Sequence, residues 1–117
     1  MPHFTCVSSN YENIKTYIEK IVNAGVKNIL ALRGDLPENC DICSDFRYAS
    51  DLVKYIKDNT SLSVAVACYP EVHKDSVSQQ HDLECFKKKI DLGAEVAYTQ
   101  LFFNNDYYYK FVENCSV

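Results

Sequence analysis

The sequence predicts an α/β fold with parallel strands, and three observations support this class. Short apolar runs alternate with segments of helical periodicity four times along the 117 residues. Each strand-plus-helix unit has about 30 residues, the length that a βαβ crossover requires. Polar residues come directly after the strands, where parallel α/β folds build their sites. Two architectures fit: a small open sheet, which the length favours, and a partial (β/α)8 TIM barrel of about four consecutive units, which the polar residues favour.

The first unit combines a strand at residues 4–7 with a helix that Ser9 caps and Gly25 ends. Glu12, three residues after Ser9, completes a capping box. The apolar residues that recur at helical spacing here are Ile14, Ile18, Ile21 and Val22. This spacing places them on one face, which we expect to pack on the sheet.

The other three units follow in order. The expected strands are residues 28–32, 63–69 and 96–102. The expected helices are residues 49–58, residues 77–92 and a last helix that opens at Asn105 or Asp106. Pro70 ends the third strand and Gly93 ends the third helix. The residues predicted to form buried helix faces are Leu52, Val53 and Ile56, then Leu83, Phe86 and Ile90, then Tyr108, Phe111, Val112 and Cys115.

Composition and charge exclude several classes of function. Apolar residues make up 47% of the chain, enough for a packed core. The net charge of -4 and the lack of a basic stripe argue against nucleic acid as a partner. No apolar stretch approaches the roughly 20 residues that span a bilayer, and the N-terminus does not resemble a secretion signal. We therefore expect a cytoplasmic protein without a membrane or nucleic-acid partner, and the length of 117 residues suits a single domain.

The six cysteines are interpreted as reduced thiols, as is usual in the cytosol. Cys6 and Cys68 lie within apolar strands and are expected to be small buried hydrophobes. Cys40 and Cys43 form one CxxC in a polar loop. A structural zinc site needs four ligands, usually from a second such pair, and the sequence has no second pair. We expect no metal site.

Polar groups follow three of the predicted strands. Arg33 and Asp35 flank Gly34 directly after the second strand, and such charges are costly near a core without a ligand or partner. The alternative is a surface turn with a local ion pair. The third strand leads into residues 69–73 (YPEVH), and the fourth carries Gln100 in an apolar context. Gln100 either binds a ligand or bonds neighbouring backbone inside a barrel.

A second pattern lies on the third predicted helix. Asp82, Cys85 and Lys89 share a stripe at offsets of three and seven residues. A lysine beside a phosphate acts as a point charge, and an aspartate accepts hydrogen bonds from ribose hydroxyls. The alternative is an ordinary solvated helix face. With only three glycines in the chain, neither a GxGxxG turn nor a P-loop exists to hold a dinucleotide.

Taken together, five segments resemble the methylenetetrahydrofolate reductase family in their order and approximate spacing. They are residues 3–6 (HFTC), 31–35 (ALRGD), 48–53 (YASDLV), 69–73 (YPEVH) and 99–103 (TQLFF). The resemblance implies a flavin-dependent (β/α)8 barrel that reduces 5,10-methylenetetrahydrofolate to 5-methyltetrahydrofolate with NADH or NADPH, in one-carbon and methionine metabolism. It implies that residues 1–117 form one partial domain, which supplies roughly the third to sixth β/α units of that barrel.

The resemblance also implies roles by position. The implied FAD contacts are His3, Arg33, Gly34, Asp35, Ala49, Tyr69, His73, Asp82, Lys88 and Lys89. Among these, Asp82 and the two lysines match positions that hold the ribose and diphosphate. Gln100 matches the glutamine that holds the folate substrate. Asp35 matches a carboxylate near flavin and pterin, where it would tune the flavin and stabilise the cationic iminium form of the substrate.

The chain departs from the family pattern in places, and alternatives stay open. Ser76 replaces a usual alanine, and Cys85 replaces an asparagine usual in bacterial members. The family's general-acid glutamate would precede His3, so we expect the isolated chain to lack full activity; a homo-oligomer of the full-length protein is a further option. A barrel lyase or aldolase without flavin would need a Schiff-base lysine or metal ligands at the strand ends, and none of the strand ends here offers a lysine. The remaining alternative is a catalytically incomplete fragment acting as a non-enzymatic interaction or regulatory module.

Overall fold

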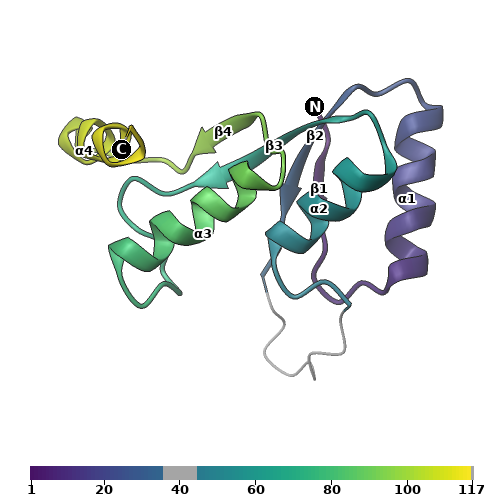
Figure 1. Ribbon diagram of the computed structural model, residues 1–117, viewed down its shortest axis with the longest axis horizontal. Helices are drawn as coiled ribbons and strands as arrows, with labels where there is room; N and C mark the ends of the chain where they lie inside the picture. The colour runs from purple at the N-terminus through teal and green to yellow at the C-terminus, as the bar shows by residue number, and fades with distance from the viewer. Residues whose placement is uncertain (36–44, 117) are drawn as a thin grey trace.

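A computed structural model describes residues 1–35 and 45–116 of the chain. Within them, four parallel strands alternate with four helices in a single sheet of order β1-β2-β3-β4 (Figure 1). The elements are β1 (His3–Thr5), α1 (Tyr11–Asn23), β2 (Asn28–Leu32), α2 (Ala49–Asn59), β3 (Ser63–Cys68), α3 (Gln79–Asp91), β4 (Val96–Thr99) and α4 (Asn105–Cys115). Sequential parallel strands joined by helices confirm the predicted class, a partial (β/α)8 barrel. The predicted Cys40–Cys43 motif lies outside the described residues.

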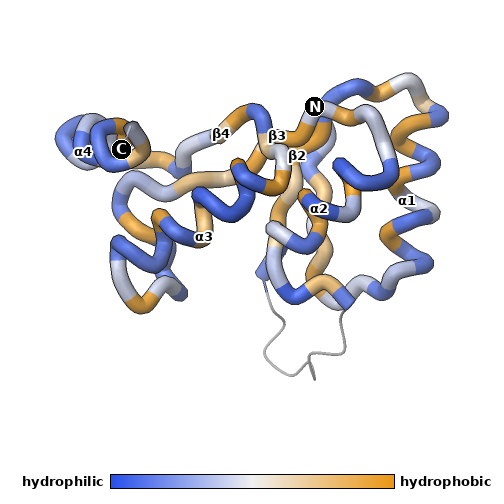
Figure 2. Tube along the Cα trace, in the orientation of Figure 1, coloured by the Kyte–Doolittle hydropathy of each residue, from blue (hydrophilic) through white to orange (hydrophobic). Residues whose placement is uncertain are grey.

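The register of the sheet separates two faces. Leu30 pairs with His3 on one side and Ala65 on the other, and Ala65 pairs with Val96. Because side chains alternate along a strand, these residues share one face and their neighbours share the other. The second face packs on α1 and α2 in a core whose members include Ile14, Ile18, Ile29, Ala31, Leu52, Val53, Ile56, Val64 and Val66. Figure 2 shows hydrophobic residues recurring along α1 and through β2 and β3.

The beginning of α1 differs from its prediction. The N-cap is Asn10, whose side chain accepts a hydrogen bond from the Asn13 N–H at 2.9 Å. Ser9, the predicted cap, instead donates its hydroxyl to the Val7 carbonyl at 3.3 Å. Both residue types cap helices well, so composition alone could not separate the two neighbouring positions.

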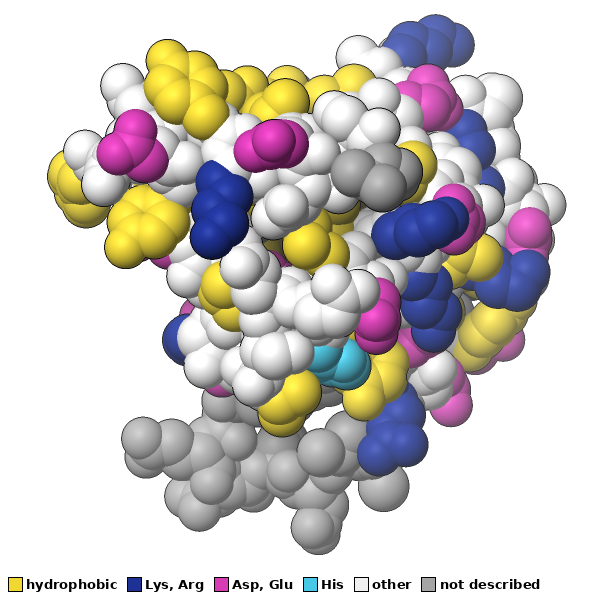
Figure 3. All heavy atoms as spheres, turned by 60° about the vertical axis from the view of Figure 1, so that its left-hand side comes forward, with side chains coloured by type: hydrophobic (Ala, Val, Ile, Leu, Met, Phe, Trp, Pro, Cys, Tyr) yellow, Lys and Arg dark blue, Asp and Glu magenta, His cyan; other side chains and the backbone are white. Residues whose placement is uncertain are grey.

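The last strand and the helices around it are less buried than predicted. β4 ends at Thr99 rather than at residue 102, and all of its residues are exposed. The predicted buried stripe of α3 is wrong, because this helix has no buried residue and Ile90 is 39% exposed. In α4 only Phe111 is buried. Hydrophobic side chains are therefore exposed near α4 (Figure 3), including Leu101 at 80% and Phe103 at 96% exposure.

Over residues 1–35 and 45–116, no helix has both the length and the apolar character needed to cross a bilayer.

Candidate functional site

Two adjoining hollows open at the carboxyl ends of the strands. The first, of about 510 Å³, lies between the beginning of α2 and the exposed side of α3. The second, of about 560 Å³, extends from the sheet face at His3 and Leu30 to the carboxyl ends of the strands, where it includes Asp35 and Gln100. The residues that line both are Leu32, Arg33, Ala67, Tyr69 and His73. The two hollows therefore form one elongated site, and the strand ends converge there as the sequence predicts.

The end of β2 places Arg33, Gly34 and Asp35 at the junction. Gly34 has φ +86°, and a Cβ there would lie 2.7 Å from Val7 Cγ1, so glycine is required by both conformation and space. Arg33 Nη2 lies 2.8 Å from Asp75 Oδ2, and Lys74 Nζ lies 3.6 Å from Asp35 Oδ1. Arg33 and Asp35 are thus ion-paired with the loop after β3 rather than with each other.

The loop after β3 is held in an unusual conformation. Val72 has φ +72°, a region that a β-branched residue rarely adopts, and its N–H donates to the Tyr69 carbonyl at 3.1 Å. The turn brings the His73 ring edge-on to the Tyr69 ring, with centroids 4.4 Å apart. The backbone N–H of His73 donates to Asp82 Oδ2 at 3.2 Å, which ties the loop to α3. Burial raises the pKa of the Tyr69 hydroxyl, so this ring stays neutral.

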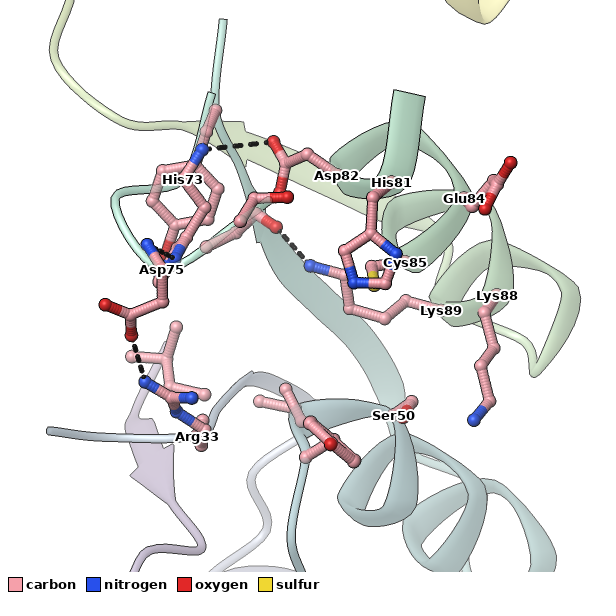
Figure 4. A pocket seen from close by; sticks show the side chains of 17 residues that line it. Arg33, Ser50, His73, Asp75, His81, Asp82, Glu84, Cys85, Lys88 and Lys89 are labelled. Carbon is pink, nitrogen blue, oxygen red and sulfur yellow. Dashed lines mark hydrogen bonds and ion pairs between the residues drawn. The ribbon is translucent and has the colours of Figure 1, made fainter. Parts of the chain in front are cut away.

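The exposed side of α3 lines one wall of the first hollow (Figure 4). Lys89 donates from Nζ to the Ala67 carbonyl at 2.6 Å, and burial lowers the pKa of this ammonium. Lys88 is exposed and projects across the hollow toward α2. Cys85 Sγ lies 3.6 Å from His81 Nε2, one turn away on the same wall. The predicted stripe of Asp82, Cys85 and Lys89 therefore does face the site.

The opposite wall is the first turn of α2. Ala49 and Ser50 line the hollow, and the first N–H groups of a helix have no partner within the helix. The Asp51 carboxylate turns back and accepts from the N–H groups of Arg47 and Tyr48, at 3.1 and 2.9 Å. The helix N-terminus thus presents N–H groups and a positive dipole opposite the lysines of α3, an arrangement that suits an anion.

The second hollow has a different character. Its walls carry His3, Asp35, Tyr98 and Gln100, with no lysine among the lining residues that the structure describes. Gln100 donates its N–H to the Cys68 carbonyl at 2.8 Å, and its side-chain Oε1 accepts from the Leu101 N–H at 2.9 Å. The side-chain oxygen of Gln100 therefore bonds neighbouring backbone, which is one of the two predicted roles. Its NH₂ group makes no hydrogen bond to another described residue and can donate to a ligand.

All ten predicted cofactor residues and Gln100 line one or both hollows. Sequence reasoning missed Asp75, Lys74 and His81. Asp75 lies 42 positions from its partner Arg33, so no local pattern could reveal the pair. His81 could have been found, because it is four residues before Cys85 and therefore on the same helix face. Within residues 1–35 and 45–116, no three or more His, Cys, Asp or Glu side chains are grouped so that they could hold a metal ion.

Comparisons with known proteins agree on one family. A family model described as methylenetetrahydrofolate reductase matches residues 1–117. The chain is 40% identical over 114 residues to the 5,10-methylenetetrahydrofolate reductase of Escherichia coli (strain K12), covering 97% of this chain and 38% of that protein. It is 38% identical over 115 residues to the enzyme of the same name from Buchnera aphidicola subsp. Baizongia pistaciae, covering 98% and 38%.

A plant relative gives the same result. The chain is 38% identical over 130 aligned positions to the methylenetetrahydrofolate reductase (NADH) 1 of Arabidopsis thaliana, covering 98% of this chain and 22% of that protein. The chain therefore spans 38% of the length of the bacterial relatives and less of the plant one.

Proposed function

The chain belongs to the methylenetetrahydrofolate reductase family, and we propose that it is the FAD-binding part of an enzyme that reduces 5,10-methylenetetrahydrofolate to 5-methyltetrahydrofolate with NADH or NADPH. The observation that carries this proposal is the elongated site at the carboxyl ends of the strands. Its two hollows share Arg33, Tyr69 and His73, so one long ligand can occupy both.

The donor groups of the site fit FAD. The first hollow opposes the α2 N-terminus to Lys88 and Lys89, which suits a diphosphate. Asp82 lies on the same wall and can accept from ribose hydroxyls. The residues that we propose to hold FAD are His3, Arg33, Gly34, Asp35, Ala49, Tyr69, His73, Asp82, Lys88 and Lys89. When bound, the flavin supplies hydride transfer between the nicotinamide and the folate.

Asp35 and Gln100 would serve the substrate. Asp35 is 94% exposed in the ion pair with Lys74, so its carboxylate is accessible to a ligand in the second hollow. A carboxylate there would stabilise the cationic iminium form of the substrate and the positive charge that develops beside it. The NH₂ group of Gln100 would hold the folate by donating to it.

Residues 1–35 and 45–116 contain four of the eight β/α units that a closed barrel needs. We therefore propose that residues 1–117 form one partial domain and that this polypeptide alone binds FAD without full turnover. The completed protein would be cytoplasmic, and a homo-oligomer would fit the family. The exposed apolar residues at β4 and before α4 favour a second candidate, a non-enzymatic interaction or regulatory module.

Flavin fluorescence separates the two candidates. FAD titrated into the 117-residue chain should show saturable quenching, and Lys88→Ala should weaken it, while Lys87→Ala should not, because Lys87 pairs with Asp91 on α3. Absence of binding by the unmodified chain would favour the interaction module.

The reaction itself needs the completed barrel. There, Asp35→Asn should slow folate reduction more than reduction of the flavin by the nicotinamide; an equal loss in both half-reactions would contradict the role given to Asp35. Robust turnover of methylenetetrahydrofolate by the 117 residues alone would contradict the proposal that this part is incomplete.

A further inference from the structure

Asp75, a residue that no motif singled out, contacts two proposed FAD ligands from different segments. Its Oδ2 lies 2.8 Å from Arg33 Nη2 at the end of β2 (Figure 4). Its backbone N–H donates to His73 Nδ1 at 3.1 Å within the loop after β3. One residue thus links the two segments that border both hollows.

The hydrogen bond from the Asp75 N–H to His73 determines which nitrogen of the imidazole ring carries a proton. A backbone N–H can only donate, so Nδ1 must be the accepting nitrogen. A neutral imidazole has one N–H, which must then be on Nε2. The ring packs edge-on to the Tyr69 ring, with centroids 4.4 Å apart, and the backbone N–H of His73 is bonded to Asp82 at 3.2 Å, so both the ring and the main chain that carries it are held. The loop therefore presents Nε2–H as a donor.

The ion pair with Asp75 holds the Arg33 guanidinium in position. Arg33 Nε donates to the Gly34 carbonyl at 3.4 Å, and Nη2 is taken by Asp75. The hydrogen bond from Arg33 is also the main reason that the pKa of Asp75 is lowered, because the bond favours the charged form of this carboxylate. The remaining N–H groups of the guanidinium are left for a ligand at the junction of the hollows.

We propose that Asp75 is a positioning residue of the site, which holds His73 as an Nε2–H donor and holds the Arg33 guanidinium at the junction of the two hollows. This inference rests on the proposed function only for the identity of the ligand. The placement of the two side chains is a property of the free chain and can be measured without FAD.

The first experiment is nitrogen NMR of the imidazole rings in the labelled chain at about pH 8.5, above the ordinary histidine titration range. His73 should show a single Nε2–H tautomer, and Asp75→Asn should leave it unchanged because the backbone N–H remains. His3 is exposed and serves as the internal comparison for an unconstrained ring. A mixture of tautomers at His73, or an Nδ1–H form, would overturn this half of the inference.

The second experiment tests the carboxylate. The side-chain Nε–H signal of Arg33 should move in Asp75→Asn and return toward its original position in Asp75→Glu. With ADP as the probe, Asp75→Asn should weaken binding by about three- to five-fold, the range expected for a half-exposed ion pair, and Asp75→Glu should recover part of it. Asp58→Asn is the matched control, since Asp58 is ion-paired with Lys54 on α2 but does not line the site.

The outcomes separate the two proposals. If ADP and FAD fail to bind the unmodified chain, the proposed function fails, while the His73 and Arg33 signals still decide the role of Asp75. If ADP binds equally to the unmodified chain and to Asp75→Asn, or if Asp75→Glu is no better than Asp75→Asn, the positioning role is wrong and the proposed function stands.

Discussion

The two halves of the molecule differ in how their helices are used. In the first half, α1 and α2 bury their apolar faces against β1 to β3, and Ile14, Leu52 and Ile56 are fully inaccessible. In the second half, α3 has no buried residue and β4 is exposed along its length. The site lies at the boundary, with one wall from α2 and the other from α3. Stability should therefore come from the first half, while the second half contributes ligand-binding side chains.

The largest expected effect comes from paired leucine truncations. Leu52→Ala removes a fully buried side chain from the core and should lower the free energy of unfolding by about 2–5 kcal/mol. Leu101→Ala, at a site 80% exposed, should change it by less than about 0.5 kcal/mol. Urea denaturation followed by circular dichroism measures both. Similar losses at the two positions would show that the halves are equally packed.

Two buried thiols, one after β1 and one at the end of β3, make the stability of the fold depend on pH. Burial raises the pKa of Cys6 and of Cys68 from 9.0 to about 11. The folded state therefore holds these protons more tightly than the unfolded state. The resulting stabilisation is complete below about pH 9 and is lost as the pH rises through about 11, at about 2 kcal/mol per thiol.

Urea denaturation at a series of pH values tests whether stability falls as the pH rises. The chain should lose stability more steeply between about pH 9 and 11 than the double variant Cys6→Ala/Cys68→Ala, in which these two groups no longer titrate. Parallel curves would contradict burial as the origin of the dependence.

Alanine substitutions at two glycines, one in each half, test how tightly each half is packed around an added methyl group. Gly34 and Gly93 both have positive φ, so alanine is strained at either position. A Cβ at Gly34 also meets Val7 Cγ1 at 2.7 Å, whereas at Gly93 it meets the flexible Lys57 side chain at 3.1 Å. Gly34→Ala should cost about 1–3 kcal/mol and Gly93→Ala less, as measured by thermal denaturation. The reverse order would show that Val7 yields more easily than Lys57.

The smallest effect concerns the ion pair that ties β4 to the first half. Glu95 accepts from Lys57 Nζ at 2.7 Å and from the Ser63 hydroxyl at 2.9 Å. Because Glu95 is solvent-exposed, Glu95→Gln should produce a small decrease in the unfolding midpoint that fades in high salt. A loss as large as that of Leu52→Ala would mean that β4 is integral to the core.

The sequence predicted the order of elements and the convergence of their ends, because both follow from local patterns. Apolar runs mark Ile29 and Val64 as strand residues, and parallel crossovers bring Arg33 and Tyr69 to one end. The stripe of α3 around Phe86 was predicted as buried because periodicity reports which residues share a face. It does not report whether a neighbouring element covers that face, and in the described residues none does so fully.

The contacts that organise the site could not be predicted in the same way. Asp75 meets Arg33 through a loop in which Val72 has a positive φ. Neither the positive φ of a valine nor an ion pair spanning 42 residues leaves a signature in local sequence. The sequence could identify which residue types gather at the strand ends, whereas their partners depend on the tertiary structure.

The most direct test of the central claim is a map of FAD contacts on the nitrogen-labelled chain. FAD should shift the amide signals of Ala49 and Lys89 in the first hollow and of Gly34 and Gln100 in the second, as one binding event with one affinity. The signal of Asn28, at the opposite end of its strand, should stay in place. Shifts confined to the amino ends of the strands, or to the exposed side chains before α4, would contradict the account.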